Sequence, residues 1–193
     1  MVPEDTATEE KPEEEKPKRK LKKVKTGGEE KEKPVLFFNA GEDKGEYQAF
    51  SNEAPYAIEV EGVRYPTVEH YYQAMKAKTF EDKEVEEKIQ ATPSAKAVKT
   101  LGKKVKNFAE EVWNDKRQEV MLRGIKAKFA QHPELQTQLK ETGSRPIGYA
   151  NPRNTFWGIG TSMGLEKAQD FEKWRGQNKL GKILIALRDD FRE

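Results

Sequence analysis

The chain has 193 residues, of which 34% are hydrophobic and 36% are charged, and its formal net charge is +2. Because so small an apolar share cannot pack a core along the whole length, we expect part of the chain to be disordered. The absence of cysteine excludes disulfides, thiolate catalysis and thiolate metal sites. The near-neutral net charge argues against a nucleic-acid binder that is basic throughout.

The sequence contains neither an apolar run that could span a bilayer nor the pattern of a signal peptide. We therefore expect a soluble, intracellular protein. Its expected location is the cytoplasm, with the nucleus as the alternative if the source is eukaryotic or viral.

The N-terminal residues 1–33 differ in composition from the rest of the chain. They contain no aromatic residue and few apolar ones, so they cannot bury enough surface to offset the entropy cost of ordering. We expect a disordered charged tail in which an acidic block, EEKPEEE, precedes a basic block, KPKRKLKKVK. This tail either solubilises the protein or serves as a nuclear-import or nucleic-acid contact patch.

Residues 34–193 are expected to form one folded domain, and its first half opens with strands. The apolar run PVLFFNA predicts a strand at 34–40. Alternation of apolar and polar residues over 56–65, with Glu61 and Gly62 at the turn, predicts a β-hairpin. Thr67 then caps a helix that runs to about Lys78.

The remainder of the domain is predicted to be mostly helical. Thr92 and Pro93 are interpreted as a cap and a first-turn proline. The loop that spans 147–160 after a short strand has too many turn formers to be a helix. The sequence therefore predicts an α+β fold in which helices dominate a small sheet or hairpin. The expected helices span residues 81–91, 94–105, 109–131, 133–143, 163–177 and 178–192.

The helix after Thr67 carries polar side chains at a spacing that brings them to one face. Glu69, Gln73 and Lys76 share that face, next to an apolar stripe that could face the core. Glu69 lies in the first turn, where the helix dipole favours its ionised form. Such a carboxylate could accept a proton from water, although ordinary capping and surface chemistry explain each residue equally well.

The sequence offers no set of residues typical of a metal site. It has two histidines and no clustered carboxylates. We therefore interpret His70 as a hydrogen-bonded side chain that orients its neighbours, and His132 as a structural residue. We expect neither a metal nor a cofactor.

The segment NPRNTFWGIG combines flat apolar rings with amide groups and glycines. Trp157 could stack on a base, Asn154 could bind its edge, and Gly158 and Gly160 would let the backbone approach a ligand. The alternative is a tight loop whose tryptophan fills the core. Its glycine spacing matches neither a P-loop nor a dinucleotide fingerprint.

Four motifs in the same order resemble a known family. They are FSN at 50–52, GVRYPTVEHYYQAMK at 62–76, FWGIG at 156–160 and GQNKLGKILIALR at 176–188. Together they resemble the YbiA-like family, also called the NADAR domain, over residues 35–192. The resemblance implies a compact helix-rich α+β fold. It also implies N-glycosidase chemistry, either on phosphoribosylamino-pyrimidine intermediates of riboflavin synthesis or on ADP-ribosylated guanine.

The resemblance also implies roles for individual residues. Glu69 and Lys76 match the family's helix pair, so Glu69 would stabilise positive charge on the sugar or activate water. Lys76 would neutralise phosphate, protonate the leaving group or form an imine with the opened sugar. Trp157 would stack on the base or ribose. The expected substrate-binding residues are Ser51, Asn52, His70, Gln73, Asn154, Trp157, Gly158, Gly160, Asn178 and Arg188.

Two positions depart from the family pattern, because Asn154 stands where aspartate is usual and Tyr149 where glutamate is usual. The main hypothesis is a metal-independent N-glycosyl hydrolase acting on a small ribosyl or ADP-ribosyl substrate. If the two departures abolish cleavage, the domain is instead an ADP-ribose or nucleotide reader. In a third hypothesis, the basic tail directs the domain to nucleic acid.

Overall fold

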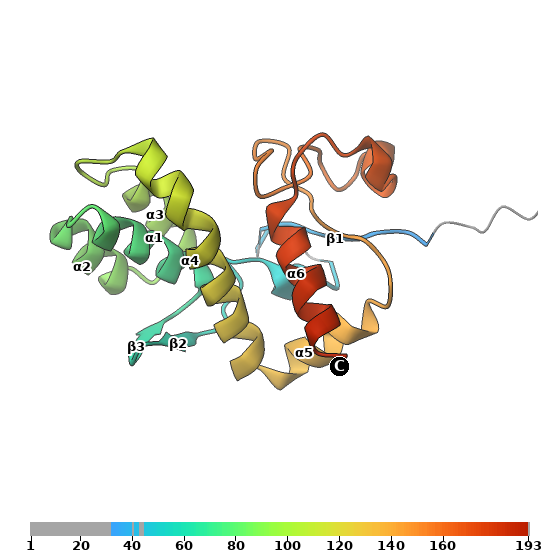
Figure 1. Cartoon of the computed structure of the whole chain (residues 1–193), viewed down its shortest axis with the longest axis horizontal. Helices are drawn as coiled ribbons and strands as arrows, with labels where there is room; N and C mark the ends of the chain where they lie inside the picture. Colours follow the sequence, from blue (N-terminus) through green and yellow to red (C-terminus); the bar gives the residue numbers. More distant parts are fainter. Residues whose placement is uncertain (1–31, 40, 43–44, 193) are drawn as a thin grey trace, which may run out of the picture. The chain divides into compact units, whose positions relative to one another are not determined.

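The computed structural model describes residues 32–39, 41–42 and 45–192 (Figure 1). The tail expected at 1–33 therefore falls almost entirely outside the described residues. Helices dominate the described part, as predicted. In chain order the strands and α-helices are β1 (Val35–Phe37), β2 (Ile58–Val60), β3 (Val63–Tyr65), α1 (Val68–Thr79), α2 (Lys83–Ala91), α3 (Ala95–Gly102), α4 (Glu110–Gln131), α5 (Pro133–Glu141), β4 (Ile147–Tyr149) and α6 (Lys179–Asp190).

The strands form two small sheets. β2 and β3 are the predicted antiparallel hairpin, and both of its turn residues, Glu61 and Gly62, have positive φ angles of 52° and 78°. This is the backbone that a two-residue hairpin turn requires. β1 pairs in parallel with β4, which follows more than a hundred residues later, and places Val35 opposite Ile147. This long-range pairing was not predicted.

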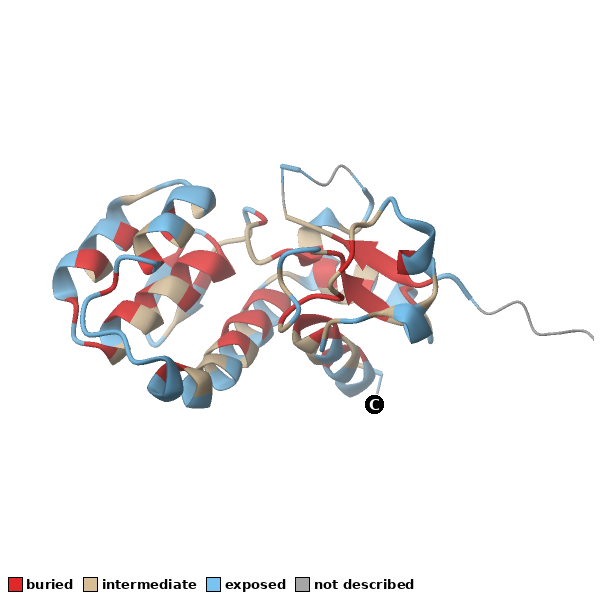
Figure 2. Ribbon diagram, turned by 90° about the horizontal axis from the view of Figure 1, so that it is seen from above, coloured by how far each residue is buried: buried red, intermediate tan, exposed pale blue. Residues whose placement is uncertain are grey.

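Helix α1 begins where the sequence predicted. The Thr67 hydroxyl accepts a hydrogen bond from the backbone N–H of His70, which satisfies one of the free donors of the first turn. The helix packs against α2, α3 and α4 and is buried on most of its circumference (Figure 2). The expected division into a core face and a solvated face is therefore wrong, since Glu69 and Tyr72 are also buried.

One predicted helix cap and one predicted helix differ from the structure. Thr92 ends α2, where its hydroxyl donates to the carbonyl of Lys88, and Ser94 is the residue that caps α3. The helix expected at 163–177 is replaced by two short 3₁₀ helices, Glu166–Gln169 and Phe171–Lys173. Asp170 separates them, because its backbone is extended and its carboxylate accepts from the N–H of Glu172.

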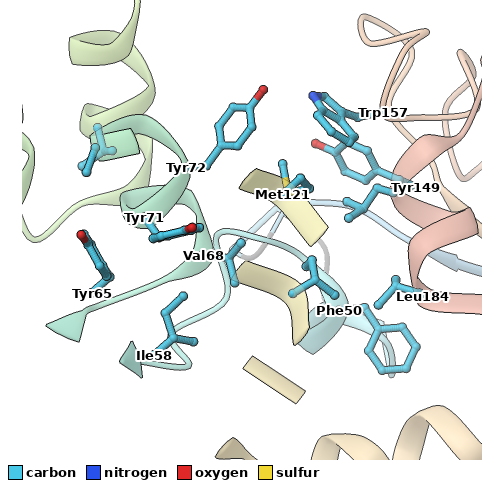
Figure 3. Close-up of a cluster of buried hydrophobic side chains, with 14 of the residues drawn as sticks. Phe50, Ile58, Tyr65, Val68, Tyr71, Tyr72, Met121, Tyr149, Trp157 and Leu184 are labelled. Carbon is cyan, nitrogen blue, oxygen red and sulfur yellow. The ribbon is translucent and has the colours of Figure 1, made fainter. Parts of the chain in front are cut away.

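The main core joins side chains from all parts of the domain. Met121 and Ile125 of α4 lie in it with Tyr71 and Tyr72 of α1, and Leu184 of α6 closes its other side (Figure 3). A smaller cluster forms around Ile159. No helix in the described part of the chain is long and apolar enough to cross a membrane.

Candidate active site

Glu69 is the chemically most unusual residue of helix α1. Its side chain is almost fully enclosed, with 5% of the residue exposed, and its carboxylate accepts a hydrogen bond of 2.8 Å from the Gln73 amide. The Asn52 side chain is a second hydrogen-bond partner of the carboxyl. Burial raises the pKa of Glu69 above its ordinary value, and Lys99 and these amides only partly oppose the shift. The net pKa shift is therefore opposite in direction to the one expected from the helix dipole.

The cation that faces Glu69 comes from helix α3. Lys99 forms an ion pair with Glu53, which lies in the loop between the 3₁₀ helix Gln48–Phe50 and β2. Burial lowers the pKa of the Lys99 ammonium, but the negative charges of Glu69 and Glu53 and the Tyr149 phenol outweigh that effect and raise it. Two carboxyl groups and one ammonium thus form a charge cluster in which Glu69 is buried and Glu53 and Lys99 are partly exposed.

Tyr149, at the end of β4, extends this cluster. Its hydroxyl donates to the side-chain oxygen of Asn39 and accepts a 2.9 Å hydrogen bond from the Asn151 amide. Burial raises the pKa of Tyr149 to about 12, Lys99 opposes this shift, and Glu53 and Glu69 add to it. The phenol therefore stays protonated at neutral pH, and it contributes a neutral hydrogen-bonding group to the cluster.

A cavity of about 820 Å³ adjoins the cluster, and we call it the main pocket. Lys99 lies on its wall, which links the pocket to the buried Glu69. Lys103 and Arg153 add positive charge, and Phe38 and Met163 add apolar surface. Its lining residues are Phe38, Asn39, Glu42, Lys99, Lys103, Ala150, Asn151, Pro152, Arg153, Asn154, Ser162 and Met163.

Lys76, the second expected catalytic residue, lies elsewhere. Its ammonium donates a 2.8 Å hydrogen bond to the carbonyl of Gly102 and sits 4.1 Å from the centre of the Phe108 ring. Burial lowers the pKa of Lys76. Lys76 therefore binds the C-terminal end of α3 and does not line the main pocket. Its catalytic role stays a prediction that this geometry does not favour.

Both ring nitrogens of His70 and the amide nitrogen of Gln73 are hydrogen-bonded within the protein, whereas the buried Gln73 side-chain oxygen has no hydrogen-bond partner among the described residues. The two ring nitrogens of His70 are 2.8 Å from the Thr67 hydroxyl and 2.8 Å from the carbonyl of Thr92, so Nε2 donates to the carbonyl and Nδ1 accepts. This arrangement is consistent with the predicted role of His70 in orienting its neighbours. Because both ring nitrogens have partners, neither is free to bind a substrate. The Gln73 amide binds Glu69, and its oxygen lies so close to Gly102 that a Cβ there would be 1.8 Å away.

Ser51 and Asn52 position the site from the loop before β2. The Ser51 hydroxyl accepts from the backbone N–H of Glu53, and the Asn52 carbonyl accepts a 3.0 Å hydrogen bond from the N–H of Glu69. The Asn52 amide nitrogen is 3.3 Å from the sulfur of Met121. Both residues thus hold Glu53 and Glu69 in place, while direct contact with a substrate stays a prediction.

Trp157 fills the core. It is 8% exposed and meets Tyr72 edge-on at 5.9 Å between ring centres (Figure 3). Gly158 approaches the protein's own backbone, because a Cβ there would lie 2.7 Å from the Tyr149 carbonyl. Gly160 adopts a positive φ of 70°. The alternative of a tight loop with a core tryptophan therefore describes this segment better than a stacking surface.

Asn154 is the expected binding residue of this loop that does line the main pocket. Its side-chain oxygen accepts hydrogen bonds from the backbone N–H groups of Phe156 and Trp157, at 3.2 and 2.9 Å. An aspartate, which the resemblance implies at this position, could accept the same two bonds, so this turn is compatible with either residue. The amide at this position contributes no charge to the pocket.

Asn178 and Arg188 serve the fold. Asn178 joins α6 to β4 through hydrogen bonds with the N–H of Tyr149 and the carbonyl of Ile147. The buried Arg188 guanidinium donates to the Thr142 hydroxyl and the Arg145 carbonyl. Neither residue lines the main pocket, although both line a smaller cavity of about 420 Å³, so substrate binding by them stays a prediction.

The comparison with protein-family models agrees with the motifs. The model of the NADAR domain matches residues 36–192. The chain belongs to the NADAR domain family. A solved NADAR fold, the NMR structure of the Escherichia coli protein YbiA, superposes on it with a TM-score of 0.65 and 28% identity. That match covers 83% of this chain and 87% of the other.

Curated relatives of this NADAR domain carry names that describe an activity. The N-glycosidase R617 of Acanthamoeba polyphaga mimivirus is 32% identical, covering 83% of this chain and 98% of that protein. The N-glycosidase YbiA of Escherichia coli K12 is 30% identical, with 80% and 86% covered. The riboflavin biosynthesis protein VVA0006 of Vibrio vulnificus is 31% identical over 84% of this chain, but the match covers 40% of that longer protein.

Sequence reasoning missed much of the pocket of this NADAR domain. Glu53 directly follows the FSN motif, so its position next to that motif was an available signal. Lys99 is one of 36 lysines and arginines, and nothing local distinguishes it. Phe38 and Asn39 end the first predicted strand, and only the pairing of β1 with β4 brings them to Tyr149. No group of three or more metal-ligating side chains gathers within the described ranges.

Proposed function

We propose that this NADAR domain is an N-glycosidase that hydrolyses a ribosyl C–N bond. The observation that carries the proposal is the buried Glu69 carboxyl beside the Glu53–Lys99 ion pair, of which Lys99 lies on the wall of a pocket of about 820 Å³. The names of relatives support the reaction type, because two are N-glycosidases and a third is a riboflavin biosynthesis protein. The substrate class is either a phosphoribosylamino-pyrimidine or ADP-ribosylated guanine.

The chemistry requires a group that manages positive charge and a proton. When the bond between the anomeric carbon and nitrogen breaks, its electron pair leaves with the nitrogen and the sugar ring becomes cationic. Water then bonds to that carbon and gives up one proton, while the leaving nitrogen gains one. Glu69 takes the proton from water, and its raised pKa brings it closer to neutral pH, where a general base works best.

The remaining residues of the cluster have complementary tasks. Glu53, ionised beside Lys99, stabilises the cationic sugar electrostatically. Lys99, Tyr72 and Tyr149 all carry a proton and interact electrostatically with Glu69. Of the three, Lys99 lines the main pocket, so it is assigned the donation of a proton to the leaving nitrogen, a part first predicted for Lys76.

The rim of the main pocket suits a phosphorylated ligand. Lys103 and Arg153 lie on its wall and are exposed, so they can neutralise phosphate without a desolvation penalty. Phe38, which stacks on Tyr149 with ring centres 6.0 Å apart, offers the flat face that was expected from Trp157. A ribose joined to a heterocycle and a phosphate would use all three features.

The deciding experiment uses both candidate substrates. The protein and its Glu69→Gln and Lys99→Met variants are incubated with a phosphoribosylamino-pyrimidine and with ADP-ribosylated guanosine, and released base is quantified by chromatography. We expect turnover of one substrate by the parent protein. A loss of about 100-fold or more is expected for Glu69→Gln, in the range that a positioned acid or base contributes.

Controls separate this mechanism from its rivals. Glu87→Gln changes an exposed glutamate of α2 and should keep full activity. Lys76→Met tests the first prediction, and a loss equal to that of Lys99→Met would restore Lys76 to the mechanism. Full activity of Glu69→Gln would remove Glu69 from it. Binding of ADP-ribose without cleavage of either substrate would instead support the reader hypothesis. The delivery role of residues 1–33 remains a separate prediction.

A further inference from the structure

Lys128 of helix α4 is a buried cation that the proposed reaction does not use. The residue has 0% exposure, and its ammonium donates to the carbonyls of Ala49 and Ser51, the latter at 2.8 Å. The nearest ring is that of Tyr56, whose centre is 5.2 Å from the ammonium. No ion pair to Lys128 is found among the residues that the structure describes. Burying a charge without a partner of opposite sign costs free energy, which indicates that this lysine has a structural or functional role.

The carbonyls that Lys128 binds belong to the segment that builds the site. Ser51 is followed by Asn52, whose carbonyl binds the N–H of Glu69 and whose amide contacts the Glu69 carboxyl. Glu53 comes next and forms the ion pair with Lys99. One hydrogen-bonded chain therefore connects α4 to the charge cluster through residues 49–53.

The chemistry of an amine fits this bracing role. The 3₁₀ helix Gln48–Phe50 ends at this segment, so its last carbonyls need donors that the short helix cannot supply itself. A lysine amine can donate to two carbonyls in either protonation state, because even the neutral form keeps two N–H bonds. An apolar side chain of equal length would fill the same space, but the Ala49 carbonyl would lose the amine donor and the Ser51 carbonyl would keep only the backbone N–H of Ala54.

We propose that Lys128 is a positioning residue that fixes residues 49–53 and thereby sets the placement of Glu53 and Asn52 against Glu69. The expected effect on kcat rests on the proposed function. The expected effect on the position of residues 49–53, and on the pKa of Glu69, does not. Removing the amine should let the segment shift, which misplaces the charge cluster while the pocket rim with Lys103 and Arg153 stays in place. Small misplacements of reacting groups lower turnover far more than they lower binding.

The first test compares Lys128→Met with Lys126→Met, which changes an exposed lysine one half-turn away on the same helix. We expect kcat of Lys128→Met to fall about tenfold or more while KM changes less than about threefold. Lys126→Met should match the parent protein. A folded Lys128→Met with parental kcat would overturn the proposal.

The second test restores the amine chemically. The chain contains no cysteine, so Lys128→Cys can be alkylated in denaturant at a single thiol and refolded. A bromoethylamine adduct rebuilds a lysine isostere, and a propyl adduct replaces the amine with a methyl group. We expect kcat to recover in the adduct that carries the amine and not in the propyl adduct. Equal kcat in the two refolded adducts would contradict the proposal. If circular dichroism shows that neither adduct refolds, the activity of Lys128→Met decides, and full activity of that variant would contradict the proposal.

The third test needs no substrate. A ¹³C-NMR titration of the Glu69 carboxyl should report a different pKa in Lys128→Met than in the parent protein, because Asn52 and Lys99 act on that carboxyl. Lys126→Met should leave it unchanged. If the parent protein cleaves neither substrate, the proposed function fails, and this titration still decides the role of Lys128. An unchanged Glu69 pKa in folded Lys128→Met would refute it.

Discussion

At the scale of the residue, Lys128 also makes a prediction about stability. Burial lowers the pKa of Lys128 to about 7, whereas an unfolded lysine titrates near about 10.4. Between those values the unfolded chain binds a proton that the folded protein has lost. The free energy of unfolding therefore rises with pH, by up to about 1.4 kcal/mol per pH unit, and is insensitive to this residue below pH of about 7.

Urea unfolding of the parent protein and Lys128→Met, from about pH 6 to about pH 9, measures this contribution. The difference between the two proteins should grow in favour of the parent as pH rises. A pH-independent difference would mean that Lys128 is not deprotonated in the folded protein.

Asn154 both stabilises a turn of the fold and lines the main pocket. Its side-chain oxygen holds the N–H groups of Phe156 and Trp157. Asn154→Asp keeps that acceptor and should change the melting temperature little, while Asn154→Ala should cost about 1 kcal/mol, as the loss of a cap does. Thermal unfolding distinguishes the two variants.

The same pair tests the departure from the family pattern. Asn154→Asp adds a negative charge to the pocket that Lys99 also lines, so we expect it to change kcat or substrate choice without changing stability. A stability loss in Asn154→Asp as large as that in Asn154→Ala would show that the amide nitrogen, and not the oxygen, holds the turn.

At the scale of the element, helix α1 depends on its N-cap more than its neighbour α3 does. Thr67 is buried, and its hydroxyl meets both the N–H and the ring nitrogen of His70. Ser94 caps α3 from an exposed position, through one contact of 3.4 Å with the N–H of Ala97, and the Thr67 contact with the N–H of His70 is of similar length at 3.3 Å. Thr67→Ala should therefore cost about 1–2 kcal/mol, at the upper end for caps, and Ser94→Ala about 0.5 kcal/mol.

Denaturant unfolding of the two cap variants checks this difference, with the slope of the transition confirming that both unfold as the parent does. Thr67→Ser is the matched control, because it keeps the hydroxyl and removes only a methyl group. Equal losses in Thr67→Ala and Thr67→Ser would assign the effect to packing rather than to the cap.

At the scale of the whole molecule, two distant segments touch through their backbones beside the site. A Cβ at Gly176 would lie 2.0 Å from the carbonyl of Gly158, a distance that no real Cβ adopts, so the segments would have to separate. Gly164, by contrast, has nothing within 4 Å of an added Cβ and no positive φ. Gly176→Ala should destabilise the fold by about 2 kcal/mol or more, and Gly164→Ala by less than about 0.5 kcal/mol.

Melting temperatures of these two glycine variants provide the comparison, and about 1 kcal/mol corresponds to about 2–4 °C in a domain of this size. Activity should fall in Gly176→Ala even below its melting temperature, since the Gly158 segment continues from Asn154 in the pocket wall. Unchanged stability in Gly176→Ala would show that the two segments are free to move apart.

Local chemistry was sufficient to predict several elements from the sequence. The Thr67 cap, the Glu61–Gly62 hairpin turn and the long helix α4 depend on neighbouring residues, so the sequence determined them directly. The family was identified by the order of its motifs, and Glu69 was proposed as a site residue by its place in helix α1, a role that stays a prediction. The prediction of a helix at 163–177 was wrong, because the Asp170 carboxylate accepts a hydrogen bond from the N–H of Glu172, and this local bond competes with helix formation.

Only the tertiary structure decided which cation meets Glu69. Seven residues along a helix correspond to a rise of about 10 Å, so Lys76 shares a face with Glu69 without reaching it, and Gly102 takes its ammonium instead. Packing of α3 and of the loop before β2 brings Lys99 and Glu53 to the carboxyl, and the parallel pairing of β1 with β4 brings Asn39 to Tyr149. Burial, which no local pattern encodes, then set the pKa of Glu69.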